Sequence, residues 1–186
     1  MSERNPGLGK VVVNRSMSLD GFIAGPGDAM DWIFDSLSSS GDEVAAIAAE
    51  TGAMLVGRRT YDVGNRMAAE NPDGPDYRFA GSTFLLTHRP PEPPDPGVTV
   101  LTGDIGSAVA TALEAAGGKN LEILGSDVAA QALRRGLVDE VLVYVVPVIL
   151  GDGTPFSGPG LGRIDLEPIS STPSGAVTIL RFRVRK

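Results

Sequence analysis

The chain has 186 residues, 42% of them hydrophobic, which suits one globular domain with a sizeable core. Its formal net charge of −7 disfavours nucleic-acid polymers and anionic membranes as partners. The absence of cysteine excludes disulfides and thiol chemistry, and the single histidine, His88, disfavours a histidine-built zinc site or a serine-hydrolase triad. No apolar run approaches the roughly 20 residues of a membrane helix and no signal sequence is recognisable, so we expect a cytoplasmic protein.

The hydrophobic pattern predicts alternating strands and helices. Residues 1–9 are expected to be a flexible lead-in to a single domain over residues 10–186. The first strand is expected over Lys10–Arg15, in the centre of a sheet because its valines are consecutive. The other expected strands are Ala53–Val56, Thr83–Thr87, Val98–Leu101, Leu121–Leu124, Val141–Leu150 and Ala176–Val184.

Helices are expected between most of these strands. One covers Asp42–Thr51 and stops at Gly52, and a second begins after Asp104 as its cap. A third follows Gly125, with Ser126 or Asp127 as the cap and Gly136 as the stop. The polar segment Asn65–Gly81 is interpreted as a loop with a ragged helical start, and Ala29–Leu37 carries the only tryptophan.

This order of elements predicts an α/β domain of three layers with a mostly parallel central sheet. In Ala176–Val184, arginines alternate with apolar residues, which indicates an antiparallel last strand with one solvent-facing side. Pro147 suggests a bulge or an edge position in the strand that contains it.

Three strand ends carry residues suited to phosphate binding. Ligands in such sheets bind beyond the carboxyl ends of the strands, where Gly57, Thr87 and Gly125 are expected. The helix that follows Gly125 would present its N-terminus, which attracts anions. We therefore expect a dinucleotide phosphate at Gly125–Ser126.

Each strand end taken alone has a simpler explanation. Gly57 permits close backbone approach, Arg58–Arg59 supply positive charge, and Thr60 offers a hydroxyl, but a capped helix start with solvated arginines explains the same residues. Arg89 can grip a ribose 2′-phosphate. His88 is more simply a surface-loop residue than a catalytic base.

Five segments of the chain form one further pattern: Ser18–Ala24, Gly57–Asp62, Leu124–Ser126, Gly136–Glu140 and Pro147–Gly153. Taken together, they resemble the dihydrofolate reductase-like family, and most of all the bacterial branch related to the reductase domain of the bifunctional riboflavin-biosynthesis deaminase-reductase. The resemblance runs from about Lys10 to Lys186 and implies the three-layer dihydrofolate reductase-like fold. The Asp-Asp-Pro or Asp-Asn-Pro motif of the riboflavin-type reductases has no match, because Asn71-Pro72 lies too far from Thr60.

The resemblance implies NADPH as cofactor. The turn at Gly57 would bind the diphosphate and adenosine side, Thr87 and Arg89 would surround the 2′-phosphate, and the turn at Gly125 would hold the diphosphate. Paired glycines are usual in the family where this chain has Gly125-Ser126. The residues expected at the cofactor are Ser16, Ile23 and Ala24 beside the nicotinamide, and Gly57, Arg58, Arg59, Thr60, Thr87, His88, Arg89, Leu124, Gly125, Ser126, Asp127 and Val128.

Hydride transfer to a C=N bond also needs a proton donor. The segment around Trp32 resembles the family's substrate-anchoring helix, although neither nearby acid has the matching spacing from Trp32. Asp31 and Asp35 are the candidate catalytic carboxylates, and each is more simply explained as a helix-terminal aspartate. Tyr144 is either a substrate contact or a core residue, and Asp20 is expected to shape its turn.

Two classes of function follow from these residues. The first is an NADPH-dependent reductase acting on a small pterin, pyrimidine or related heterocycle, with 5-amino-6-(5-phosphoribosylamino)uracil reductase as a variant of it. The second is a non-catalytic nucleotide-binding protein with the same fold. The apolar surface of the last two strands further predicts a homodimer that includes the loop 154–162.

Overall fold

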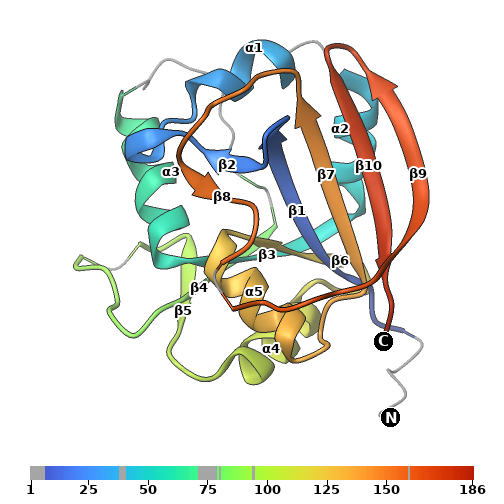
Figure 1. Cartoon of the computed structure of the whole chain (residues 1–186). Helices are drawn as coiled ribbons and strands as arrows, with labels where there is room; N and C mark the ends of the chain where they lie inside the picture. Colours follow the sequence, from blue (N-terminus) through green and yellow to red (C-terminus); the bar gives the residue numbers. More distant parts are fainter. Residues whose placement is uncertain (1–6, 38–40, 71–78, 80, 94, 159) are drawn as a thin grey trace.

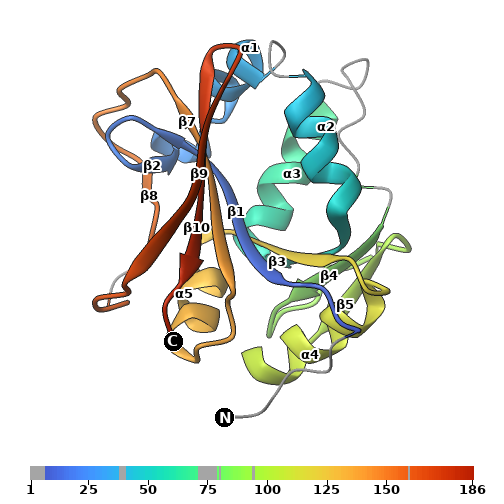
Figure 2. The ribbon, with the colours of Figure 1, turned by 90° about the vertical axis from the view of Figure 1, so that its right-hand side faces the viewer.

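The computed structural model describes residues 7–37, 41–70, 79, 81–93, 95–158 and 160–186, whose arrangement appears in Figure 1 and, turned by 90°, in Figure 2. Most of the predicted lead-in over residues 1–9 and the Asn71-Pro72 pair lie outside the described residues. Within them, no helix is long and apolar enough to cross a bilayer.

Eight strands of the described chain form one sheet in the order β5-β4-β3-β6-β1-β7-β10-β9. The strands from β5 to β7 in this order run parallel, and β10 runs antiparallel to β7 and β9. This confirms the predicted α/β class, with its mostly parallel sheet and antiparallel last strand. The strands are β1 (Val11–Ser18), β3 (Thr51–Gly57), β4 (Ser82–Leu86), β5 (Val98–Leu101), β6 (Asn120–Leu124), β7 (Glu140–Val146), β9 (Leu166–Ser174) and β10 (Val177–Val184), while β2 (Phe22–Ala24) and β8 (Thr154–Pro155) pair separately.

The helices cover both faces of the sheet. On one face, α4 and α5 pack over β1, β3 and β6, and on the other face α2 and the turn η2 pack over β1, β7 and β10. Figure 2 shows α2 and α3 on the side of the sheet opposite α4 and α5. The helices are η1 (Pro26–Asp28), η2 (Asp31–Ile33), α1 (Phe34–Leu37), α2 (Gly41–Glu50), α3 (Arg58–Glu70), α4 (Ile105–Ala115) and α5 (Ser126–Arg134).

Strand β1 lies in the centre of the sheet, between β6 and β7, as its consecutive valines predict. Side chains alternate between the two faces of a strand, so Val11 and Val13 enter the core under α4 and α5 while Val12 enters the opposite core. All three are at most 2% exposed. A strand buried on both faces holds its backbone rigidly up to the edge where it ends.

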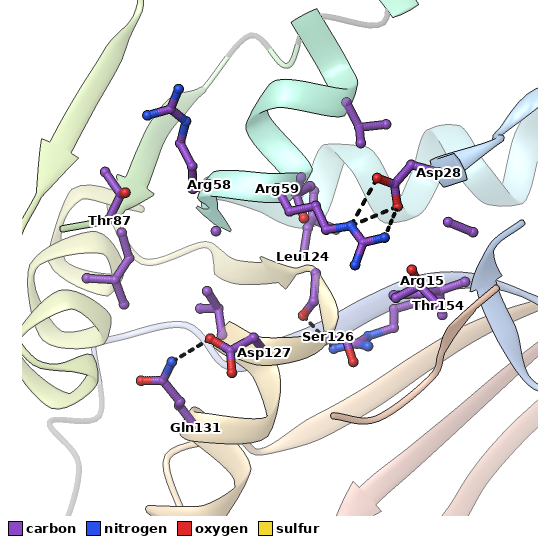
Figure 3. Close-up of a pocket in the computed structure, with 18 of the residues that line it drawn as sticks. Arg15, Asp28, Arg58, Arg59, Thr87, Leu124, Ser126, Asp127, Gln131 and Thr154 are labelled. Carbon is purple, nitrogen blue, oxygen red and sulfur yellow. Dashed lines mark hydrogen bonds and ion pairs between the residues drawn. The ribbon is translucent and has the colours of Figure 1, made fainter. Parts of the chain in front are cut away.

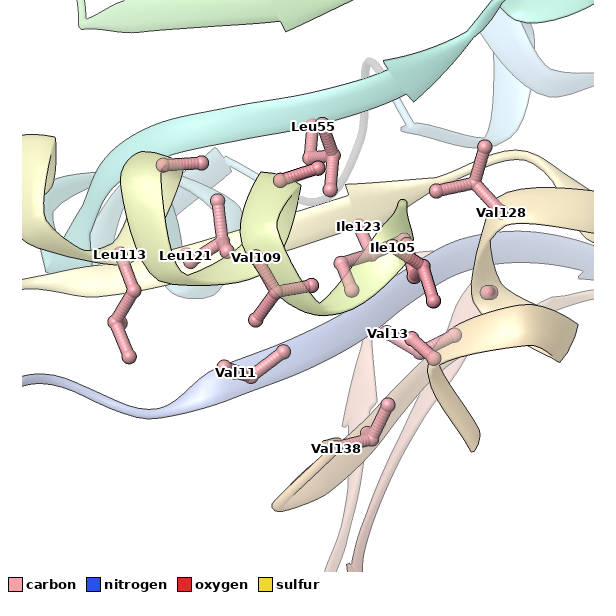
Figure 4. Close-up of a cluster of buried hydrophobic side chains, with 14 of the residues drawn as sticks. Val11, Val13, Leu55, Ile105, Val109, Leu113, Leu121, Ile123, Val128 and Val138 are labelled. Carbon is pink, nitrogen blue, oxygen red and sulfur yellow. The ribbon is translucent and has the colours of Figure 1, made fainter. Parts of the chain in front are cut away.

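Helix α4 forms as its sequence predicts. The carboxylate of Asp104 accepts hydrogen bonds from the backbone N–H groups of Gly106 at 2.8 Å and Ser107 at 3.4 Å, which caps the first turn. Apolar residues recur at every fourth position and point at β3 and β6 (Figure 4): Ile105, Val109 and Leu113.

Several element boundaries differ from the predicted ones. Strand β7 ends at Val146 because Pro147 has no N–H to donate to a neighbouring strand. Helix α3 runs from Arg58 to Glu70, so the helical start predicted for Asn65–Gly81 is the C-terminal part of this helix. Gly52 does not stop the helix, because α2 already ends at Glu50 and Gly52 lies inside β3. A Cβ at Gly52 would collide with the carbonyl of Ala116, which explains the glycine at this position.

The C-terminal strands differ from the predicted arrangement in two ways. Strand β9 was not expected, because its sequence is polar and contains Pro168 and Pro173, which an edge strand tolerates. The prediction that one side of β10 faces solvent is wrong over half of the strand, because Ile179 on that side is buried against the second core. On that side Arg181 donates to Glu140 at 2.6 Å and is ion-paired with it.

A buried polar cluster lies on the α2 side of the sheet. Glu122 of β6 is 2.7 Å from Oγ1 of Thr51, and that hydroxyl is also 3.2 Å from the carbonyl of Ile47. A hydroxyl has one hydrogen, so when Thr51 donates to Ile47 the contact with Glu122 needs a proton on the carboxyl group. Burial raises the pKa of Glu122, against the lowering effect of hydrogen bonds to Thr51 and Asn14.

The raised pKa of Glu122 predicts a pH dependence of stability. The folded state holds this proton more tightly than the unfolded state, so its contribution is present below the ordinary pKa of 4.5 and is lost as pH rises through the raised value. In Glu122→Gln this loss is absent. Urea unfolding between pH 4 and pH 8 should therefore show the variant gaining stability relative to the parent as pH rises, and a difference that does not change with pH would contradict the burial argument.

Candidate functional site

A cavity of about 570 Å³ opens where β3, β4 and β6 end. Gly57 is the last residue of β3, and Thr87 and Gly125 directly follow β4 and β6. All three line the cavity, as expected for ligand sites at the carboxyl ends of parallel strands. The three predicted strand ends therefore meet at one place, although they are far apart in the sequence (Figure 3).

All fifteen residues predicted to contact a cofactor line this cavity. Their convergence is a geometric finding, and their role remains a prediction. Residues that the sequence did not single out complete the lining: Asn14, Arg15, Asp28, Met30, Ile33, Val63, Leu86, Gly103, Gln131 and Thr154.

The two glycine turns pack closely against each other. A Cβ at Gly57 would lie 2.9 Å from Cγ2 of Val128, and a Cβ at Gly125 would collide with Oγ1 of Thr60. Gly125 also has φ +90°, which residues with a side chain rarely adopt. The starts of α3 and α5 therefore approach each other at a distance that only glycine permits.

Helix α5 begins without a side-chain cap. The prediction that Ser126 or Asp127 caps it is wrong, because Gly125 holds the N-cap position and no side chain bonds there. Ser126 Oγ donates instead to the carbonyl of Pro155 at 3.2 Å, and Asp127 accepts from Gln131 at 2.9 Å. The N–H groups of the first turn are thus left for water or an anion in the cavity.

An ion pair crosses the mouth of the cavity. Nε and Nη2 of Arg59 on α3 lie 2.8 Å and 2.6 Å from Oδ1 of Asp28 on η1. Arg66 donates to the carbonyl of Asp28 at 3.2 Å. Asp28 itself has φ +64°. These contacts fasten the loop around η1 to α3, as the dashed lines of Figure 3 show for Arg59.

On the far side of the cavity, two arginines lie close together. Nη1 of Arg58 donates to the carbonyl of Arg89 at 2.5 Å, and its Nε donates to Asp62 at 2.8 Å. The hydroxyl of Thr87 accepts from the N–H of Arg89 at 3.1 Å and so shapes this turn. His88 and Arg89 are exposed, which is compatible with the surface-loop interpretation of His88.

The floor of the cavity contains a charge that the sequence analysis missed. Arg15 of β1 is only 5% exposed, and its Nη2 donates to the carbonyl of Gly125 at 2.8 Å. Its Nη1 donates to the carbonyl of Phe156. Arg15, two positions after Val13 and four after Val11, falls on the same buried face of the strand as these valines, and this alternation is the signal that could have identified it.

The predicted catalytic and substrate residues are not brought together by this cavity. Asp31 is exposed and does not line it, and the side chain of Asp35 lies outside the described residues. Trp32 packs against the second core and donates from Nε1 to the carbonyl of Ala29 at 3.0 Å. Tyr144 is buried in β7, and burial, above all, raises the pKa of its phenol, which also hydrogen-bonds to Asn14.

Asp20 shapes a turn, as expected. Its carboxylate accepts hydrogen bonds from Ser18 Oγ at 2.7 Å and from the N–H groups of Leu150 and Gly151 at 3.1 Å and 2.7 Å. These bonds, the first of them most strongly, lower the pKa of Asp20. Two of the segments that carry the family resemblance are thereby joined. Among the described residues, no cluster of three or more acidic or histidine side chains could hold a metal ion.

Solved structures with the same fold include a protein from Shewanella sp. PV-4 assigned to riboflavin biosynthesis, with a TM-score of 0.79 and 22% identity over 95% of this chain and 99% of that chain. A second structure is the diaminohydroxyphosphoribosylaminopyrimidine deaminase/5-amino-6-(5-phosphoribosylamino)uracil reductase of Thermotoga maritima, with a TM-score of 0.67 and 18% identity over 96% of this chain and 57% of that chain. A third is dihydrofolate reductase of Enterococcus faecalis with NADP(H), with a TM-score of 0.59 and 15% identity over 97% of this chain and 98% of that chain.

These similarities establish the dihydrofolate reductase-like fold that the sequence motifs predict. The sequence profile of one family matches the chain over nearly its whole length, from residue 9 to residue 180. The match includes β1, the three strand ends around the cavity and most of the antiparallel strands. The chain therefore belongs to the RibD C-terminal domain family.

Proposed function

We propose that the protein is an NADPH-dependent reductase that transfers hydride to a pterin, a pyrimidine or a related heterocycle. The observation that carries this proposal is the convergence of three strand ends and two glycine turns on one cavity of about 570 Å³. A cavity of this size is typical of small-ligand and cofactor sites. The family, and the dihydrofolate reductase fold with NADP(H) bound in the Enterococcus faecalis enzyme, support it.

The residues present fit a dinucleotide. A side chain at Gly57 or Gly125 would fill the space between α3 and α5, so both turns can bring backbone N–H groups close to a phosphate. The uncapped start of α5 would take the diphosphate. Thr87 and Arg89 would border a 2′-phosphate, and Ser16, Ile23 and Ala24 would flank the nicotinamide. Bound there, the cofactor would supply the hydride.

The substrate would occupy the end of the cavity nearest η1 and η2. Met30 and Ile33 give this end apolar walls, while Asn14 and Ser16 of β1 offer an amide and a hydroxyl. The walls would exclude water, and the polar groups would orient a heterocycle. The proposed proton donor at this end is Asp35, two residues after Ile33, or Asp31. Trp32 and Tyr144 are the proposed substrate contacts.

The second candidate is a nucleotide-binding protein without catalysis. The exposure of Asp31 outside the cavity favours it, because a proton donor must reach the substrate. Activity as a 5-amino-6-(5-phosphoribosylamino)uracil reductase is a third candidate, supported by the fold of the Thermotoga maritima enzyme.

A cytoplasmic homodimer remains part of the proposal. Strand β9 is at the edge of the sheet and exposes two large apolar side chains, Leu166 at 39% and Ile169 at 42%. An edge strand with exposed apolar residues suits a contact with a second copy.

Binding of NADPH tests the proposed cofactor. A ligand present at about 100 times its Kd stabilises the folded state by about 2.7 kcal/mol, so thermal unfolding should shift upward with NADPH and less with NADH, because of Arg58 and Arg89. Consumption of NADPH with dihydrofolate or a pyrimidine substrate, followed at 340 nm, would separate the reductase from a non-catalytic binder. No thermal shift with either nucleotide would refute the proposal.

Replacing Gly125 by alanine tests the glycine turn. Gly125→Ala should lose about 1–3 kcal/mol of stability for its backbone alone, because φ +90° with ψ +146° is a conformation that essentially only glycine adopts. It should lose more through the collision with Thr60 and bind NADPH at least about tenfold more weakly. Gly136→Ala is the control for a positive φ, because Gly136 has φ +63° but no atom within 4 Å of the added Cβ. It should lose about 1–2 kcal/mol in urea unfolding and keep its NADPH affinity; an equal loss of affinity in both variants would exclude a specific role for the turn.

The ion pair at the mouth of the cavity should oppose binding of an anion. Asp28→Asn removes a negative charge and releases Arg59, so NADPH should bind up to about fivefold more tightly, the equivalent of about 1 kcal/mol for an exposed pair. Isothermal titration at low salt measures this change. Asp165→Asn, which breaks the exposed pair with Arg163, is the control. Weaker binding in Asp28→Asn would instead mean that Asp28 holds Arg59 in its binding position.

A further inference from the structure

Arg15 differs from the other basic residues of the structure in its burial. Among the described residues it is the one lysine or arginine that is buried, and it lines the cavity from β1. Burial lowers its pKa to about 10, so the guanidinium still carries its positive charge at neutral pH.

The contacts of Arg15 satisfy its hydrogens only in part and do not neutralise its charge. The two terminal nitrogens donate to the carbonyls of Gly125 and Phe156, and the guanidinium carbon lies 4.9 Å from the centre of the Phe156 ring. The buried Nε has no hydrogen-bond partner. Within the described part of the chain, no carboxylate forms an ion pair with Arg15. By contrast, the buried carboxylate of Glu140 is paired with both Lys10 and Arg181.

A buried charge without a counter-charge destabilises a folded protein. Carbonyl dipoles and an aromatic face compensate only part of that cost. A neutral amide such as glutamine could donate to the same carbonyls without the cost, so holding the turn does not explain why a cation is present. An anion in the cavity would explain it.

We propose that Arg15 is an anion-binding residue of the cavity, and that its guanidinium interacts with the diphosphate of the dinucleotide. This inference rests on the proposed function. Arg15 donates to the carbonyl of Gly125, the N-cap residue of the uncapped helix α5, so the guanidinium is held at the same turn as the free N–H groups, and both belong to the lining of the cavity. Figure 3 shows Arg15 next to Ser126 and Thr154, on the side of the cavity that Arg59 closes. Fixed charge and backbone N–H groups would then act on one phosphate group.

Three probes of different charge test the assignment by titration calorimetry: NADPH, inorganic pyrophosphate, and adenosine 2′-monophosphate, which carries the 2′-phosphate without the diphosphate. In Arg15→Gln, we expect NADPH and pyrophosphate to bind at least about tenfold more weakly, and adenosine 2′-monophosphate to bind as in the parent. The salt dependence of NADPH binding should also become less steep, because one cation is lost from the site. Arg183→Gln, which removes an exposed ion-paired arginine of β10, should change none of these values.

Arg15→Lys separates charge from turn geometry, and it decides the question if Arg15→Gln does not fold. Lysine keeps the charge but offers one ammonium nitrogen in place of the two terminal nitrogens of the guanidinium, which weakens its hold on the two carbonyls. We therefore expect its affinity for pyrophosphate to fall between those of the parent and Arg15→Gln. An equal loss of all three probes, or an affinity of Arg15→Lys no better than that of Arg15→Gln, would show that Arg15 only holds the turn.

The outcomes also distinguish this inference from the proposed function. If the parent binds NADPH and Arg15→Gln binds it equally well, the role of Arg15 is refuted and the cofactor proposal stands. If the parent binds pyrophosphate through Arg15 but binds neither NADPH nor NADH, the anion site stands and the cofactor proposal is refuted. If the parent binds neither pyrophosphate nor NADPH, both are refuted.

Discussion

The contact between the two glycine turns is the constraint on which the cavity depends. Strands β3 and β6 are parallel neighbours in register, with Val56 opposite Leu124, so their turns begin at the same level of the sheet. The missing side chains at Gly57 and Gly125 let α3 and α5 start almost in contact, with Val128 and Thr60 filling the space between them. Two helix N-termini therefore face one cavity, which concentrates positive potential there in a protein whose net charge is −7.

Strand β1 separates a buried cation on one face of the sheet from a buried acid on the other face. Because side chains alternate across a strand, Arg15 lies on the α5 side of the sheet, while Asn14 lies on the α2 side and hydrogen-bonds to Glu122 and Tyr144. A buried cation and a buried acid are thus kept on opposite faces, where they do not neutralise each other. Strand β1 can hold such an arrangement because its neighbours are packed on both faces of the sheet.

Much of the fold could be predicted because its signals are local. Apolar runs identified the parallel strands, Asp104 identified the start of α4, and glycines after strands identified the edge at which a ligand would bind. Strand β9 could not be predicted in this way, since its polar sequence is held by pairing with β10 and not by its own pattern. The full extent of α3 was not predicted, because most of its residues are polar.

The site was predictable in outline but not in its electrostatics, because caps and charge partners depend on contacts between distant segments. Ser126 has the right residue type to cap α5, yet Pro155 takes its hydroxyl. Trp32 and Tyr144 have the right chemistry for a substrate pocket, yet both pack against the second core. In the sequence Arg15 looks like the polar end of a strand, and only the paths of α5 and of residues 154–156 over it make it buried.

The two ends of the cavity differ in a way that follows from this same strand. Where β1 passes under α5, residue 15 contributes a cation, and on the opposite face residues 14 and 16 contribute an amide and a hydroxyl. An anionic group would be more stable at the first position than at the second, because a charge moved to the end with apolar walls would lose its solvation without gaining a partner. The second position, with apolar walls and neutral polar groups, suits an uncharged heterocycle. One strand would therefore fix both the orientation of a dinucleotide and the end at which its substrate binds.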